Sequence, residues 1–165
     1  MNRSELLLTL LHESVEECYA NDRSLIERRM EQSCVARIYY YMQKAIDFDD
    51  RFIDLRDFNL DSEYYKNGQN SKKTESFQHG AKPDVILHQR ECNSNNLLIV
   101  EFKTAVRRQS NDVSRDFKKL EAFTKDSKYS YFLGVFIDLN INGPRFTYFQ
   151  AGQEKLETEL SNEKS

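Results

Sequence analysis

Glu101 and Lys103 are two charged residues at the end of an otherwise apolar run that begins at Leu97. Side chains alternate between the two faces of a β-strand, so residues two apart project from the same face. If Leu97 to Thr104 is a strand, Glu101 and Lys103 therefore lie side by side. A strand buried on both faces should be apolar throughout, and a buried charge costs stability unless it is paired or binds an ion. The two residues thus mark a candidate site.

Asp84 stands in a similar position at the start of a second apolar run, 85–87. It follows Pro83, which is tolerated at the beginning of a strand. The polar stretch Glu91 to Asn96 predicts a hairpin between the two apolar runs. In an antiparallel hairpin the start of the first strand lies beside the end of the second. We therefore expect Asp84 to meet Glu101, although the two are 17 positions apart in the sequence.

Two carboxylates and a lysine at one point suit the hydrolysis of phosphodiester bonds. Magnesium prefers hard oxygen ligands and takes one or two carboxylates, leaving positions for water and phosphate. We expect Asp84 and Glu101 to be these ligands, with Mn²⁺ able to substitute for Mg²⁺. The ion acidifies a bound water and neutralises charge on the phosphate, and Lys103 can stabilise the transition state. Isolated Glu-x-Lys pairs are common, so a surface ion pair at a strand end is the structural alternative.

Two helices are predicted before these strands. Ser4 to Ala20 has the apolar repeat of an amphipathic helix. Ser24 and Glu27 form a capping-box signature, which predicts a second helix from Ser24 to about Ala45. Glu31 lies on the apolar side of this second helix. Because an acid is normally excluded from such a face, Glu31 is predicted to be an accessory catalytic acid. The apolar residues of its stripe are Cys34, Val35 and Ile38.

Strand structure and a loop are predicted between the second helix and Pro83. The apolar residues between Arg51 and Tyr65 indicate one or two short strands, with Glu63 at their end as a further candidate acid. Tyr65 to Lys82 is polar and carries turn dipeptides, so it is predicted to be a flexible surface loop.

The second half of the chain supplies one helix and a second hairpin. Asn111 to Lys125 repeats apolar residues at helical spacing. Tyr131 to Leu139 and Arg145 to Gln150 are predicted to be strands joined by an Asn142-Gly143 turn. Residues 151–165 are expected to form a tail that frays. With 165 residues in all, we expect one compact α/β domain with helices packed on a mixed sheet.

Pro83-Asp84 followed by Glu101-Phe102-Lys103 resembles the motif that names the PD-(D/E)XK nuclease superfamily. The resemblance implies a restriction-endonuclease-like core of the order αβββαβ from about residue 24 to 150, with an extra N-terminal helix and a C-terminal β-hairpin. It also implies metal ligation by Asp84 and Glu101, and water activation or phosphate stabilisation by Lys103. Many members use a further glutamate on the helix before the sheet, which corresponds here to Glu31.

A narrower resemblance joins Glu31 to Tyr41, Pro83 to Arg90 and Asp116 to Leu120. These segments are similar to a branch of small, largely uncharacterised bacterial and phage proteins within the superfamily. The similarity implies accessory roles for Asp116 and Lys119 on the helix after the active strand. A solvated helix face is the structural alternative for both residues.

The charge is unevenly distributed along the chain. The whole protein has a net charge of -3, whereas Lys103 to Lys128 carries eight basic and four acidic residues. A basic segment directly after the active strand fits contacts with a phosphate backbone, although charged surface helices are common. The residues predicted to contact nucleic acid are Lys72, Lys73, Arg107, Arg108 and Arg115. No DNA-recognition motif is evident, so specificity would come from loops, from the partner in a homodimer or from the structure of the nucleic acid. A recruiting protein partner is the alternative to a homodimer.

The remaining residue types exclude several other classes of protein. Cys18, Cys34 and Cys92 show no paired spacing, so neither a disulfide framework nor a zinc site is indicated. Cys18 and Cys34 are expected to be buried thiols in a reducing, cytoplasmic setting. His88 is interpreted as a partly buried structural histidine. No apolar run approaches the roughly 20 residues of a membrane span, and the start of the chain does not indicate a signal peptide.

The sequence thus predicts a metal-dependent nuclease that acts on DNA in preference to RNA, in DNA processing or in conflict between phage and host. The first alternative is a catalytically inactive module of the same fold that binds nucleic acid or a protein partner. The second is an interaction protein whose motif is coincidental. That reading leaves the acids at the apolar strand ends without an explanation.

Overall fold

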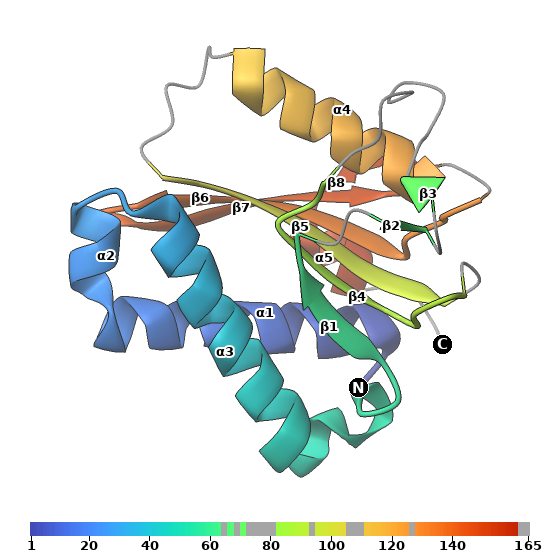
Figure 1. Ribbon diagram of the computed structural model, residues 1–165, viewed down its shortest axis with the longest axis horizontal. Coiled ribbons are helices and arrows are strands. Elements are labelled where there is room, and N and C mark those ends of the chain that lie inside the picture. The colour runs from blue at the N-terminus through green and yellow to red at the C-terminus, as the bar shows by residue number, and fades with distance from the viewer. Residues whose placement is uncertain are drawn as a thin grey trace.

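The computed structural model describes residues 1–63, 66–67, 70–71, 82–92, 95–104, 111–125 and 128–161. These residues form helices on both sides of a mixed sheet (Figure 1). The elements in chain order are α1 (Arg3–Asn21), α2 (Arg23–Glu27), α3 (Glu31–Phe48), the 3₁₀-helix η1 (Asp50–Leu55), β1 (Asn59–Ser62), β2 (Lys66–Asn67), β3 (Asn70–Ser71), β4 (Val85–His88), β5 (Asn96–Thr104), α4 (Asn111–Lys125), β6 (Leu133–Asn140), β7 (Gly143–Gln150), β8 (Gln153–Lys155) and α5 (Glu157–Ser161).

The main sheet has six strands in the order β1-β4-β5-β6-β7-β8. Strands β5 and β6 are parallel and are connected through α4, whereas every other neighbouring pair is antiparallel. The predicted mixed α/β class is therefore confirmed. Both predicted hairpins, β4 with β5 and β6 with β7, are confirmed as well.

Strand β5 lies in the middle of this sheet and is covered on both faces. Helix α4 packs on one face, and α1 and α3 pack on the other (Figure 1). Ile99 belongs to the smaller core under α4, whereas Leu98, Val100 and Phe102 belong to the larger core with α1 and α3. The continuous apolar sequence of β5 follows from this double burial.

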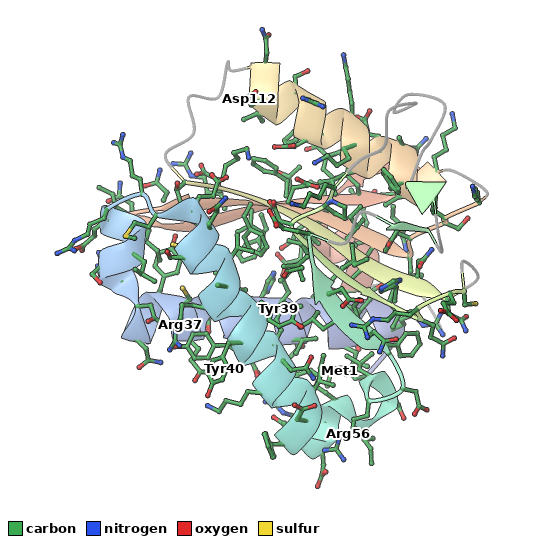
Figure 2. All side chains as sticks on the ribbon, in the orientation of Figure 1. Met1, Arg37, Tyr39, Tyr40, Arg56 and Asp112 are labelled. Carbon is green, nitrogen blue, oxygen red and sulfur yellow. The ribbon has the colours of Figure 1, made fainter. Side chains whose placement is uncertain are left out.

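Helix α3 is fastened to the edge of the sheet as well as to its face. The Tyr39 hydroxyl donates to the Leu60 carbonyl of β1 at 2.9 Å (Figure 2). Tyr40, the next residue of α3, is half-exposed. This alternation suits a helix that packs along one side only.

Helix α1 agrees with the helix predicted from Ser4 to Ala20, but the prediction of a single second helix is wrong. The chain from Ser24 to Ala45 is two helices, because a turn at 28–30 separates α2 from α3. Arg29 has a φ of 58°, and the Met30 amide donates to the Leu25 carbonyl at 2.9 Å, which closes the end of α2. The capping box is also absent, since Glu27 pairs with Arg23 at 3.1 Å and Asp22 precedes the helix. Glu31 consequently stands in the first turn of a new helix.

Two further segments differ from the prediction. Residues 51–55, predicted as part of a strand region, belong to the 3₁₀-helix η1, and among the described residues of that region β1 is the one strand. Phe52 and Leu55 are both buried, and their spacing of three residues matches a 3₁₀ turn. Residues 153–161, expected to fray, form β8 and α5 instead, because Leu160 is fully buried in the larger core.

Gly134 of β6 allows α4 to lie close to the sheet. A Cβ at this position would stand 3.0 Å from Cγ2 of Thr124 and 3.3 Å from Cβ of Phe149. Gly134→Ala is therefore expected to lower the free energy of unfolding by about 1–3 kcal/mol, measured by urea denaturation. Thr124→Ser removes Cγ2, so the double variant should recover part of this loss. Equal stability of Gly134→Ala and the wild type would show that α4 moves away freely.

Candidate active site

Asp84 lies directly before β4 and beside the end of β5. In the β4–β5 hairpin Val85 is opposite Val100, so the preceding residue faces the position of Glu101. The Asp84 Oδ2 atom accepts a hydrogen bond from the Phe102 amide at 2.8 Å. Burial raises the pKa of the Asp84 carboxyl. The prediction that the hairpin brings Asp84 beside the Glu-x-Lys pair is thus confirmed.

Glu101 is an almost completely buried acid, with 2% of its surface exposed. It shares a strand face with Ile99, which places it under α4. Its Oε2 accepts from Nζ of Lys119 at 2.8 Å, whereas its Oε1 is buried and has no hydrogen-bond partner in the described part of the chain. Burial raises the pKa of Glu101, and the Lys119 charge opposes this effect. The carboxylate therefore has an acceptor oxygen to offer.

Asp116 and Lys119 lie one turn apart on the buried side of α4. Asp116 occupies the same stripe as Val113 and Leu120, which pack against the sheet. Its Oδ1 is 3.4 Å from Nζ of Lys119. The solvated helix face considered for these two residues is wrong, because both side chains are buried over Glu101.

Lys103 lies between the helices of the two faces. Its Nζ is 3.3 Å from Oε1 of Glu31 on α3 and 3.5 Å from Oδ2 of Asp116 on α4. Burial by itself lowers the pKa of Lys103, but the charges of Asp116, Glu31 and Asp84 outweigh it, so the pKa is raised. Lys103 is therefore held as a cation at the end of β5.

Glu31 joins the same group from the start of α3. Besides its contact with Lys103, its Oε2 accepts from the Thr104 amide at 3.0 Å. The Thr104 hydroxyl in turn donates to the Arg29 carbonyl at 3.3 Å. With 35% of its side chain exposed, Glu31 faces the end of β5 and not the apolar core. The break between α2 and α3 produces this placement, because it puts Glu31 at a helix end.

Other predicted site residues lie apart from this group. Glu63 is exposed and pairs with Lys82 at 2.8 Å, although its amide donates to the Asp84 carbonyl. Arg115 is exposed on α4. His88 is buried and lies 3.0 Å from Asp61, which agrees with a structural role. Lys72, Lys73, Arg107 and Arg108 lie outside the described residues.

Two exposed arginines beside the site were not among the residues predicted from the sequence. Arg28 and Arg29 form the turn that contacts Thr104, and within the described parts of the chain neither makes an ion pair. Their adjacency, two and three residues before Glu31, is the only signal that the sequence offered. Unpaired cations at the rim of an acidic site suit a polyanionic ligand.

The donor atoms fit a hard divalent cation in kind, but the side chains are not arranged as a formed site. Among the described residues, no three Asp, Glu, His or Cys side chains form a group that could hold a metal ion. Asp84, directly before β4, and Glu101, on the neighbouring strand β5, nevertheless supply carboxylate oxygens, and Oε1 of Glu101 has no donor among the described residues. Such oxygens are the ligands of Mg²⁺ and Mn²⁺. In this structure Lys119 neutralises Glu101.

Comparison of the chain with protein-family models and with curated proteins finds no match. In the portion that the structure describes, no helix is both long enough and apolar enough to cross a membrane. The geometry of the site is therefore the basis for inferring what the protein does.

Proposed function

We propose that this protein is a metal-dependent nuclease that hydrolyses phosphodiester bonds, and that DNA is its preferred substrate over RNA. The observation that carries the proposal is the convergence of Asp84, Glu101, Lys103 and Glu31 at one end of β5. Three separate elements supply these side chains, and no apolar core requires them there. Along the chain, the strands of the main sheet and the helices packed on it include the order α3, β1, β4, β5, α4, β6. This order supports a restriction-endonuclease-like core.

In this proposal Asp84 and Glu101 would hold a divalent cation, Mg²⁺ or in its place Mn²⁺. When bound, the ion would supply an acidified water and neutralise charge on the phosphate. Oε1 of Glu101 accepts no hydrogen bond from any residue that the structure describes, so it is available as a ligand atom. Burial of Glu101 excludes bulk water and strengthens the electrostatic interactions around it.

Lys103 supplies the positive charge that the reaction needs beside the phosphate. Glu31 and Asp116 approach its ammonium from opposite faces of the sheet and fix its position. An ammonium with three donors can hold the attacking water and also a non-bridging phosphate oxygen. The water oxygen forms a new bond to phosphorus and loses its proton to solvent, while the bond to the leaving sugar oxygen breaks and that oxygen takes up a proton from solvent. The charge that develops on the phosphate is stabilised by Lys103.

The deciding experiment incubates purified protein with DNA and with RNA, with and without Mg²⁺ or Mn²⁺. Glu101→Ala and Lys103→Ala should each lower the cleavage rate by about a hundredfold or more. Lys118→Ala, which removes an exposed lysine of α4, should leave the rate unchanged. Cleavage that survives both site substitutions would contradict the assignment. Absence of cleavage by the wild type, together with absence of Mn²⁺ binding, would favour the inactive alternative.

A non-catalytic module that binds nucleic acid is the second candidate function. The observation that favours it is the 2.8 Å ion pair between Lys119 and Glu101, which leaves the acid neutralised without a metal ion. Such a module would bind DNA equally well with a chelator or with Mg²⁺ and would not cleave it. For either function we propose a reducing, cytoplasmic setting, which the buried free thiols of Cys18 and Cys34 support.

Arg28 and Arg29 are expected to contact the phosphate backbone in both cases. Arg28→Gln with Arg29→Gln should weaken DNA binding and reduce the slope of log K against log salt by about 1–2. Binding would be measured by fluorescence anisotropy in a chelator, so that cleavage does not interfere. Arg3→Gln is the matched control. Arg3 is at the start of the 19-residue helix α1, whereas the end of α1 leads into α2 and the turn that carries Arg28 and Arg29. An unchanged salt slope in the double variant would exclude this contact.

A further inference from the structure

Lys119 and Glu101 form a buried ion pair between α4 and β5. Their closest atoms are 2.8 Å apart, with 11% of the Lys119 side chain and 2% of the Glu101 side chain exposed. Burying two charges costs free energy because each loses its hydration, and only their mutual attraction offsets that cost. Removing the charge of Lys119 would leave the buried Glu101 carboxylate uncompensated, whereas Lys119 without Glu101 would keep Asp116 as an acidic partner at 3.4 Å. The pair is therefore a strong constraint on the metal-free state.

The same pair places a cation on the carboxylate that a metal ion would bind. The Lys119 ammonium contacts Oε2 of Glu101, and in this structure no acidic cluster of the described residues forms a metal-holding group. An ammonium and a divalent cation on one carboxylate repel each other strongly at such distances. A cation that binds Glu101 must therefore compete with Lys119.

Asp116 provides a second acceptor for the displaced lysine. Its Oδ1 is already 3.4 Å from Nζ of Lys119, one helical turn away on α4. A change of side-chain rotamer can shift the ammonium from Glu101 to Asp116 without moving the helix. Asp116 also lies 3.5 Å from Lys103, so it keeps both lysines within the site.

We propose that Lys119 is a built-in counter-ion of Glu101, which a divalent cation displaces onto Asp116. This regulation rests on the proposed function, because it presumes that Glu101 is a metal ligand. In the metal-free protein Lys119 preserves the fold by neutralising Glu101. In the metal-bound protein Asp116 retains Lys119 beside the site. The pair thus sets the affinity for metal as a balance between two cations.

The test measures Mn²⁺ affinity by isothermal titration calorimetry and the melting temperature with and without Mn²⁺. Lys119→Met keeps the length of the side chain and removes its charge. It should lower the melting temperature of the metal-free protein and tighten Mn²⁺ binding by about tenfold. Lys118→Met is the matched control on the exposed side of α4 and should resemble the wild type in both measurements. Asp116→Asn should weaken Mn²⁺ binding, because the displaced lysine loses its acceptor.

The outcomes distinguish a failure of the counter-ion proposal from a failure of the nuclease proposal. Mn²⁺ binding by Lys119→Met that is equal to or weaker than the wild type would overturn the counter-ion role and leave the nuclease proposal intact. No Mn²⁺ binding by either protein would overturn both. If Lys119→Met does not fold without metal, Lys119→Gln replaces it, because its amide can still donate to Glu101. The same comparison of Mn²⁺ affinities then decides.

Discussion

Glu101→Gln is expected to lower the rate of metal-dependent DNA cleavage by about a thousandfold while the protein stays folded. The amide is nearly the same size as the carboxylate and can still accept from Lys119, but it carries no charge for a divalent cation. Without metal ions the variant should be more stable than the wild type at neutral pH, by about 1–3 kcal/mol, because a costly buried carboxylate is gone. Single-turnover cleavage and urea denaturation measure the two effects.

The two opposite effects distinguish a functional acid from a structural one. Glu63→Gln is the matched control, because Glu63 is an exposed acid that pairs with Lys82 near the same end of β4. It should change neither rate nor stability appreciably. A Glu101→Gln variant that cleaves at the wild-type rate, or that is less stable than the wild type without metal, would contradict the role given to this residue.

Lys103→Met is expected to lower the cleavage rate by about a hundredfold and to leave Mn²⁺ binding in place. Its ammonium contacts Glu31 and Asp116 but no atom of Asp84 or Glu101 at ion-pair distance, so its loss removes transition-state stabilisation and not a metal ligand. Lys103→Arg keeps the charge with a different shape and should recover only part of the rate.

Metal binding and catalysis are therefore separable at this position. Cleavage rates measured at saturating Mn²⁺ and affinities from calorimetry give the two quantities independently. Lys118→Met again serves as the control for loss of a lysine from the protein. A Lys103→Met variant that loses Mn²⁺ binding in proportion to its rate would show that the lysine acts through the metal site alone.

The features that the sequence predicted well depend on local patterns. The apolar run 97–100 identified β5, the polar stretch before it identified the β4–β5 hairpin, and helical spacing identified α4 with its full length. From these elements alone Asp84 could be brought to Glu101, because an antiparallel hairpin fixes which residues lie opposite each other.

The features that the sequence did not predict depend on contacts between distant elements. A continuous helical pattern hid the break after α2, which is stabilised by turn hydrogen bonds and by the contact of Arg29 with Thr104. The 3₁₀-helix at 50–55 has the same apolar residues as a strand, and the burial of Phe52 and Leu55 against the larger core selects the helix.

The Glu-x-Lys pair and its hairpin partner Asp84 were thus determined by the sequence itself, since strand alternation and hairpin pairing are local rules. Only the tertiary structure decided that Glu31 meets Lys103 and that Lys119 neutralises Glu101. Both contacts require helices from opposite faces of the sheet to reach the end of one strand. No periodicity along the chain encodes that meeting, because it is set by how the helices pack.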